Sequence, residues 1–533
     1  MEMTYQRLDD EVVIIVPTGM LGAGISPEHV RRGIEQGAAA IAVDSGSTDS
    51  GPSYLARGVS KMNRESVKSD LMVIMAEAYS AGIPVLVGTC ATSGTDQGVN
   101  WTRDIAIEVA EELNIQPKIA CLYSEQDKDT LKQKNKDGKI TPLAPKGELE
   151  DDVIDSCDHI VALMGPEPYI EAVKAGADVV LGGRTTDTAV LSAVALMNGA
   201  GAGQSWHAAK IAECGGQCTV HIRKGGVLMR VGKEAFDIEP LDLENQTSPE
   251  TVSAHMLYES TDPLRLTEPG GILDVTDAIY VQADDRITRV TGSVWNPQPY
   301  TMKLEGARSG PYQTIMIVGI EDPHVLANLD AFHDQMQDLL TQRIASGFAE
   351  ETSDFDVSLR IYGWNGTSGQ PVPAGTPPPR DVGVMFVVTA PTQDLANRMA
   401  KSCNPLFFHM PMPGHIELPS YAFPFTPADI PRGQVYEFVL NHVVHVQDGL
   451  ELVRTGWVDM KKADNMERTQ AYGQRHLPTC ADQECRPVLG NRRLLLQGFR
   501  HVQRIQGFRR SWARSFRPAL WHRPDEHQAH SGR

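Results

Sequence analysis

The stretch Ala38-Ala-Ala-Ile-Ala-Val-Asp-Ser-Gly-Ser-Thr-Asp-Ser-Gly-Pro52 decides the fold class of this 533-residue chain. It joins a short apolar run, typical of a strand buried on both faces, to a polar loop rich in Gly and Ser. The same change recurs along the first 190 residues, and helical patterns lie between the repeats. Six buried strands are therefore expected, at residues 12–16, 38–43, 84–88, 118–123, 159–164 and 177–181. This alternation predicts an α/β fold with a doubly wound, mainly parallel sheet.

The pattern changes after residue 218. Short β-like runs at 219–223, 227–231, 278–283 and 286–294 predict a β-rich extension of the first domain, which is expected to cover residues 1–305. From residue 306 the order is strand, helix, strand, strand, helix, strand, which predicts a ferredoxin-like α+β domain over residues 306–462. The Pro-, Phe- and Met-rich loop at 404–433 suggests an interface in a homo-oligomer.

The last segment, residues 463–533, has a different composition. Residues 466–533 contain 13 arginines, no lysine and 5 acidic residues, with no helical or strand period. Three interpretations stay open: a basic arm, a disordered tail, or the product of a shifted or unspliced reading frame. The lack of any pattern favours the last two.

Composition excludes several classes of function. The net charge of −19 argues against general binding to nucleic acid. No apolar stretch approaches the roughly 20 residues needed to cross a bilayer, and the polar N-terminus does not resemble a secretion signal. A cytoplasmic protein without a membrane role is expected, and its eight cysteines are interpreted as reduced thiols. Three spaced pairs, Cys214/Cys218, Cys480/Cys485 and His442/His445, do not form a recognised zinc set.

Polar loops follow the predicted strands, and ligands bind at the carboxyl ends of strands in open parallel sheets. The loop at 44–52 offers Asp44 and Asp49 for proton transfer, and both are compatible with Mg²⁺. The loop at 182–187 opens a helix, whose free amides and positive dipole, together with Arg184, suit an anion. The predicted substrate-binding residues are Ser45, Gly46, Ser47, Thr48, Ser50, Gly51, Thr89, Ser93, Gly182, Gly183, Arg184, Thr185, Thr186 and Asp187. The alternative is a set of capped turns.

Other candidates carry less specific patterns. Glu125 follows a predicted strand and is a candidate general base, as is Asp127, although both also fit a solvated turn. His207 is a candidate acid or base, and a packed core histidine is the alternative. Cys90 is a candidate nucleophile or an inert thiol. The loop at 18–24 does not fit the G-x-G-x-x-G fingerprint, which argues against a dinucleotide site.

Several ordered motifs resemble the acyclic terpene utilisation (AtuA-like) family. They are Asp44-Ser-Gly-Ser-Thr-Asp-Ser-Gly-Pro52, Tyr123-Ser-Glu-Gln-Asp127, Gly182-Gly-Arg-Thr-Thr-Asp-Thr188, Trp206-His-Ala-Ala-Lys210, His255-Met-Leu-Tyr-Glu259, Glu268-Pro-Gly-Gly-Ile-Leu-Asp274 and Tyr300-Thr-Met-Lys-Leu-Glu-Gly306. The resemblance spans roughly residues 12–460. It implies a role in breaking down branched, terpene-derived acids as CoA thioesters, and a small α+β partner subunit or domain that the tail does not resemble.

The leading functional hypothesis is an enzyme that acts on a small carboxylate or acyl-CoA thioester by hydratase or lyase chemistry. Its partner is then a small anionic substrate, and the residues require no particular cofactor. Two alternatives stay open: a non-catalytic metabolite-binding or scaffold subunit, and an NAD-linked oxidoreductase.

Overall fold

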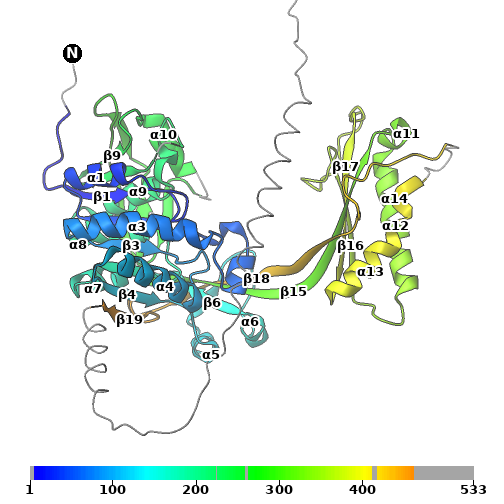
Figure 1. The fold of residues 1–533 in the computed structure, drawn as a ribbon, viewed down its shortest axis with the longest axis horizontal. Helices are drawn as coiled ribbons and strands as arrows, with labels where there is room; N and C mark the ends of the chain where they lie inside the picture. The colour runs from blue at the N-terminus through cyan, green and yellow to red at the C-terminus, as the bar shows by residue number, and fades with distance from the viewer. Residues whose placement is uncertain (1–4, 224, 258–261, 411–416, 461–533) are drawn as a thin grey trace, which may run out of the picture. The chain divides into compact units, whose positions relative to one another are not determined.

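The computed structural model describes residues 5–223, 225–257, 262–410 and 417–460. The predictions for the tail at 463–533, including Cys480 and Cys485, lie outside the described residues. The described chain is a mixed α/β structure with a ten-stranded sheet, a three-stranded sheet and a six-stranded sheet (Figure 1).

Five parallel strands form the centre of the ten-stranded sheet. In spatial order they are β1 (Val12–Val16), β2 (Ala40–Asp44), β3 (Val85–Gly88), β7 (Val179–Gly182) and β4 (Lys118–Tyr123). Almost every residue in them is buried, as expected for apolar strands covered on both faces. Their bounds agree within two residues with five of the six strands that the apolar runs predict.

The sixth predicted strand, at 159–164, belongs elsewhere. β6 (His159–Ala162) pairs antiparallel with β15 (Thr301–Ile320) in the six-stranded sheet, with Leu304 opposite Ala162. The prediction of six parallel strands at one edge is therefore wrong, because a short apolar run shows burial but not its partner strand. A bridge between Met164 and Thr185 still brings the end of this segment beside the loop after β7.

Helices pack on both faces of the parallel strands. One face carries α1 (Pro27–Glu35), α3 (Arg64–Ala81) and α4 (Asp96–Leu113), and the other carries α7 (Glu167–Lys174), α8 (Asp187–Met197) and α9 (Ala202–Ala212). Side chains of Asn63, Thr95 and Thr186 accept backbone N–H bonds at the starts of α3, α4 and α8. The remaining short helices of this region are η1 (Thr48–Ser50), α2 (Ser53–Arg57), α5 (Lys128–Lys136), α6 (Asp151–Ser156) and η2 (Gly215–Cys218).

The β-rich region extends the ten-stranded sheet with antiparallel strands. Beyond β1 lie β8 (Val227–Val231), β9 (Ala235–Pro240), β13 (Thr288–Thr291) and β12 (Ile279–Gln282). A separate three-stranded sheet contains β10 (Arg265–Glu268), β11 (Gly271–Asp274) and β14 (Val294–Pro297), and α10 (Pro249–Ala254) and η3 (His255–Leu257) precede it. The strand predicted at 219–223 is wrong, because η2 runs there into turns.

The six-stranded sheet has the order β16 (Asp356–Tyr362), β17 (Val382–Ala390), β15, β18 (Ile430–His445) and β5 (Ile140–Pro142), with β6 also on β15. Alternating burial along β17 places one face on a core with α12 (Leu329–Gly347) and α13 (Gln393–Cys403), beside α11 (Pro323–Leu326) and α14 (Leu406–His409). The boundary predicted at 305 falls inside β15. After β18 the chain returns to the ten-stranded sheet, where β19 (Arg454–Asp459) pairs antiparallel with β4.

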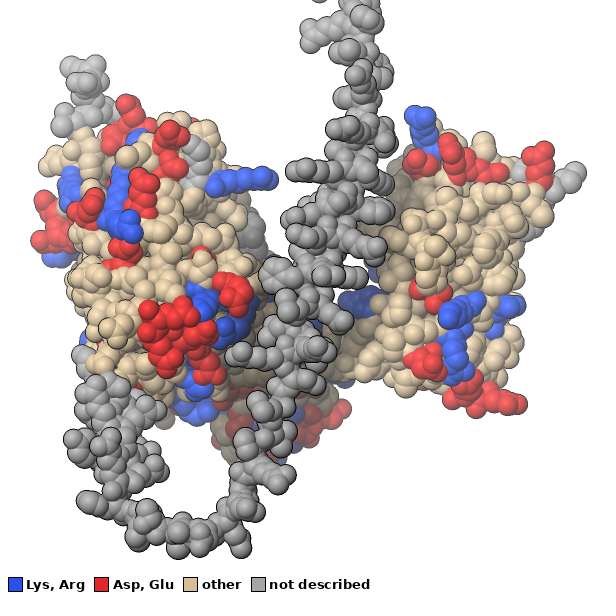
Figure 2. Space-filling view, viewed as in Figure 1, with Lys and Arg blue, Asp and Glu red and all other residues tan. Residues whose placement is uncertain are grey.

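Along residues 5–460, apart from the short undescribed gaps, no helix is long and apolar enough to span a bilayer. On the face shown in Figure 2, acidic and basic side chains lie beside one another rather than in one continuous basic area.

Candidate functional site

Two adjoining cavities lie where the loops after β1, β2 and β7 meet the end of α9. Their volumes are about 730 Å³ and about 480 Å³. Both cavities are lined by Ser47, Asp49, Asp187 and Glu213, so they form one continuous site. Both loops singled out in the sequence, at 44–52 and 182–187, therefore contribute to the same site.

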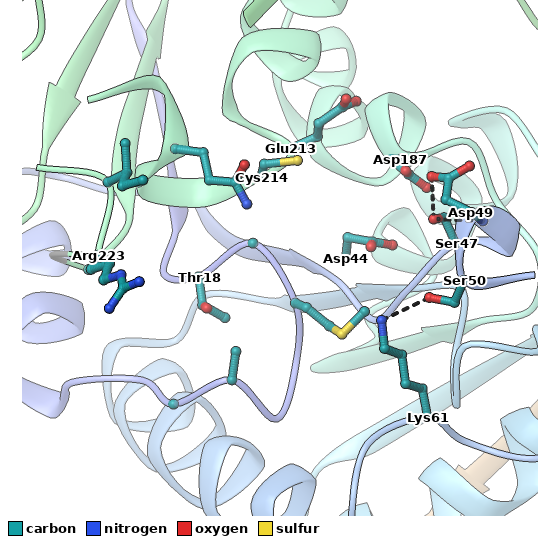
Figure 3. A pocket seen from close by; sticks show the side chains of 18 residues that line it. Thr18, Asp44, Ser47, Asp49, Ser50, Lys61, Asp187, Glu213, Cys214 and Arg223 are labelled. Atoms are coloured by element: carbon teal, nitrogen blue, oxygen red, sulfur yellow. Dashed lines mark hydrogen bonds between the residues drawn. The ribbon is translucent and has the colours of Figure 1, made fainter. Parts of the chain in front are cut away.

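Asp44 ends β2 and lies in the wall of the larger cavity. Its side chain is only 6% exposed, and Oδ2 accepts a hydrogen bond from the Gly46 amide at 2.9 Å. Oδ1 is buried and has no hydrogen-bond partner among the described residues. Burial, and then the nearby Asp187, raise the pKa of Asp44 well above its usual value. Burial at this position therefore favours the protonated form of the Asp44 carboxyl group. Figure 3 shows it in the same open space as Asp187 and Glu213.

A buried ion pair from the end of α9 borders the same space. Lys210 Nζ lies 2.5 Å from Glu213 Oε1, and both residues line the smaller cavity. Burial, despite Lys210 and with help from Asp187, raises the pKa of Glu213 to about 8. Glu213 and its neighbouring carboxylates keep the pKa of Lys210 above its usual value despite its burial. This pair was not among the predicted residues, although two charged residues three positions apart at the end of a buried helix are a usable sign.

Glu268 at the end of β10 adds a further carboxyl group to the smaller cavity. Its Oε1 accepts a hydrogen bond from Thr188 Oγ at 2.8 Å, and its buried Oε2 has no partner in the described part of the chain. Burial raises the pKa of Glu268 to about 7. Glu268, Glu213 and Asp44 thus form a set of carboxyl groups whose proton affinity is high.

Arg184 is held inside the protein rather than presented to solvent. Its side chain donates through Nε to Glu305 Oε2 at 3.0 Å, through Nη1 to Thr89 Oγ1 and the Thr185 carbonyl, and through Nη2 to Thr48 Oγ1. Four of its five N–H groups are thereby used, although the residue still lines the smaller cavity. Glu305, on β15, was not among the predicted residues. The alternation of Lys303 and Glu305 along that strand puts both side chains on one face, where Lys303 Nζ lies 2.8 Å from Glu305 Oε1.

The loop after β3 joins the other two loops. Thr89, Ala91 and Thr92 have φ angles of 48°, 55° and 61°, a conformation that costs free energy for residues other than glycine. Thr89 is fully buried, accepts from the Thr185 amide at 3.2 Å and donates to the Thr185 carbonyl at 3.1 Å. Ser93 is also fully buried and bonds Thr95. Neither Thr89 nor Ser93 lines a cavity, so both position the loops.

The remaining predicted binding residues have distinct places. Ser50 lines the larger cavity and accepts from Lys61 Nζ at 2.9 Å. Ser47 donates to Asp49 at 2.6 Å. Thr186 lines the smaller cavity and caps α8. The other predicted binding residues line neither of the two cavities and shape the loops through backbone turns and close packing. They are Ser45, Gly46, Thr48, Gly51, Gly182, Gly183 and Thr185.

Four other candidates lie outside both cavity linings. Glu125 accepts from the Asp96 amide at 2.8 Å and pairs with His159 at 2.5 Å, and these partners keep its pKa low despite burial. Asp127 caps α5. Burial lowers the pKa of His207 to about 3, and its ring nitrogens bond Ser293 and Tyr280. Burial raises the pKa of the Cys90 thiol far above its usual value.

One group of three described side chains has the geometry to hold a metal ion. It consists of Glu213, Cys214 and His255. Exposed cations, Lys61 and Arg223, stand at the larger cavity, and Arg265 and Lys303 at the smaller one. The site therefore combines proton-holding carboxyl groups with positive charges suited to an anionic ligand.

Comparison with known proteins adds the family. The family model described as "Acyclic terpene utilisation family protein AtuA" matches residues 99–238 and 242–440, more than half of the chain. No curated protein and no solved structure matches. The match includes the loop at 182–187, α9 and β15, and confirms the resemblance carried by the sequence motifs. The chain belongs to the acyclic terpene utilisation family.

Proposed function

We propose that this protein is an enzyme that moves protons on a small carboxylate or acyl thioester, in hydratase or lyase chemistry on branched, terpene-derived acids. The observation that carries the proposal is Asp44, a buried carboxyl group with an unpartnered oxygen at the wall of a 730 Å³ cavity. A carboxyl group whose protonated form is favoured by burial can act as a general acid at such a place. Family membership supports the substrate class.

Elimination of water from a 3-hydroxyacyl compound needs two proton-transfer groups. A base takes the proton on the carbon beside the carbonyl, that electron pair forms the double bond, and the C–O bond breaks. An acid then protonates the leaving hydroxide to give water. Glu268 suits the role of the general base, because its pKa of about 7 lets it accept a proton near neutral pH. Asp44 suits the role of the general acid. The reverse steps perform hydration.

The cations around the site support an anionic substrate. Arg265 and Lys303, whose side chains are partly exposed, line the smaller cavity, where they favour a carboxylate or the developing charge on a thioester oxygen. Lys61 and Arg223 lie at the larger cavity, where they suit the phosphates of a CoA group. The larger cavity has enough volume for an extended acyl chain or part of such a carrier.

The test is turnover of short, branched α,β-unsaturated acyl-CoA thioesters, followed by loss of the conjugated absorbance. Asp44→Asn keeps the size of the side chain but removes its transferable proton, so turnover should fall by about 10²-fold or more while thermal stability is retained. Glu268→Gln should act in the same way. The matched control is Glu171→Gln, an exposed residue of α7 outside both cavities.

Two outcomes would contradict the proposal. If Asp44→Asn retains wild-type turnover, Asp44 is not the acid. If the thioesters stabilise the wild-type protein against heat but are never converted, the site belongs to a non-catalytic binding subunit.

A further inference from the structure

A compact group of metal-ligating side chains borders the larger cavity. Glu213 and Cys214 directly follow α9, and His255 begins η3. Each offers one ligand atom, and the three atoms lie within 4.8 Å of one another. We propose that Glu213, Cys214 and His255 bind a divalent transition-metal ion, with zinc as the best match, and that its open coordination position faces the cavity.

The donor set identifies the class of metal. A thiolate and an imidazole are ligands that zinc and similar ions prefer, whereas Mg²⁺ and Ca²⁺ are held almost entirely by oxygen. Three protein ligands with a fourth position left for water or substrate are typical of catalytic zinc, and four protein ligands are typical of structural zinc. The group therefore differs from a Mg²⁺ site at Asp44 and Asp49, with which the sequence is merely compatible.

The three side chains lie where a bound metal ion would contact a small molecule in the larger cavity. Glu213 and Cys214 both line the larger cavity, and Figure 3 shows them on one side of it. Glu213 and His255 are only 4% and 6% exposed, so these two donors are held in place by packing. A rigid pair of ligands beside an accessible one leaves coordination space on the cavity side.

The surrounding charges favour a cation at this point. Asp187 and Glu268 act electrostatically on Glu213. Lys210 is the close cation, and its contact is with Oε1 of Glu213, whereas a carboxylate has two oxygens.

Sequence spacing does not reveal this group. The nearby pair Cys214 and Cys218 does not form a recognised zinc set, and Cys218 is fully buried with its thiol donating to the Gly215 carbonyl at 3.4 Å. The actual neighbour, His255, comes 41 residues after Cys214 in the chain. Because no regular spacing relates it to Glu213 and Cys214, a motif search does not find the group.

Metal binding can be measured on the full chain without substrate. Protein stripped with a chelator is titrated with Co²⁺, which gives a thiolate-to-metal charge-transfer band only when a cysteine is a ligand, and zinc content is measured by mass spectrometry after loading. We expect about one tightly bound ion per chain and a charge-transfer band that saturates at that ratio. Cys214→Ser should abolish the band, and His255→Gln should weaken zinc binding at least about tenfold.

Cys218→Ser is the matched control, since it removes a thiol four residues away and should leave the band and the zinc content unchanged. Melting temperatures establish that each variant is folded. A wild-type protein without the band at saturating Co²⁺, or a band that survives in Cys214→Ser, overturns the proposal.

The inference does not depend on the proposed function. If the metal binds as described and Asp44→Asn still turns over substrate, the metal site is confirmed and Asp44 is not the general acid. If no metal binds and turnover still depends on Asp44, the proposed function stands and the metal site fails. Where both hold, a metal held by Glu213, Cys214 and His255 would supply Lewis-acid polarisation of a substrate carbonyl oxygen.

Discussion

Replacing Glu305 by Gln tests how the two loops of the site are held together. Glu305 is buried and pairs with Arg184 at 3.0 Å and with Lys303 at 2.8 Å. Although burial alone would raise the pKa of Glu305, these cations lower it from 4.5 to about 2. At about 1.4 kcal/mol per pKa unit, the ionised carboxylate contributes about 3 kcal/mol to folding. Removing it also leaves the Arg184 charge, only 5% exposed, without its closest partner.

We expect Glu305→Gln to lower the free energy of unfolding at pH 7 by about 3 kcal/mol, measured by urea denaturation. The effect has a defined pH dependence. Because the folded pKa is lower than the unfolded one, the stabilisation is present above about pH 4.5 and is lost as the pH falls towards 2. At pH 3 the difference between the two proteins should therefore be less than about half of its value at pH 7.

The control is Glu437→Gln on β18. Glu437 pairs with Arg308 at 2.7 Å, but both side chains are 44% exposed, so its loss should cost less than about 1 kcal/mol. A difference below 1 kcal/mol for Glu305→Gln, or one that does not change between pH 7 and pH 3, would refute this account of the pair.

Three further predictions concern buried residues near the site. Gly182→Ala should prevent normal folding, because a Cβ atom at this position would overlap the Tyr169 hydroxyl. The control is Gly147→Ala, at a position with open space, which should melt like wild type. A normal melting curve for Gly182→Ala would show that the packing around Tyr169 can adjust. Cys90 should resist alkylation at pH 8 in the native protein, since burial raises its pKa, and rapid labelling detected by mass spectrometry would contradict this. Burial lowers the pKa of His207 from 6.5 to about 3, so the folded protein keeps this imidazole neutral and should lose stability as the pH falls below about 6.5. The melting temperatures at pH 7 and pH 5 should therefore differ less in His207→Gln than in the wild type.

Sequence patterns located the parallel strands well, because burial on both faces leaves a continuous apolar run. The same patterns could not assign β6, since the run of five apolar residues at 160–164 is equally compatible with either sheet. They also could not show that β19 joins β4, because strand pairing across more than 300 residues leaves no local trace. Local periodicity reports the environment of a segment, and the partner comes only from the packing of the whole chain.

The residues of the site were likewise predictable where they lie in the loops after the parallel strands, and not where they come from distant segments. Loops at carboxyl ends of strands were predictable, and Asp44, Asp49 and Asp187 do line the cavities. Glu213, Glu268 and Glu305 were missed because they reach the site from a helix end and from strands of other sheets. Conversely, His207 suggested catalysis by residue type alone, and the structure places it between Ser293 and Tyr280 in the core.

Arg184 was predicted from the sequence to bind the substrate anion. Its contacts in the structure indicate a different main role for this side chain. The side chain gives most of its donors to Glu305, Thr48 and Thr89, one from each of three separate segments, so its main effect is to fix the loops at 44–52 and 89–94 against β15. A charge already balanced by a carboxylate attracts a second anion weakly. Lys210 is similarly balanced by Glu213, unless a proton or a metal ion takes over that carboxylate. A metal ion on the second oxygen of Glu213 would weaken that balance, which links metal binding to anion binding at one side chain.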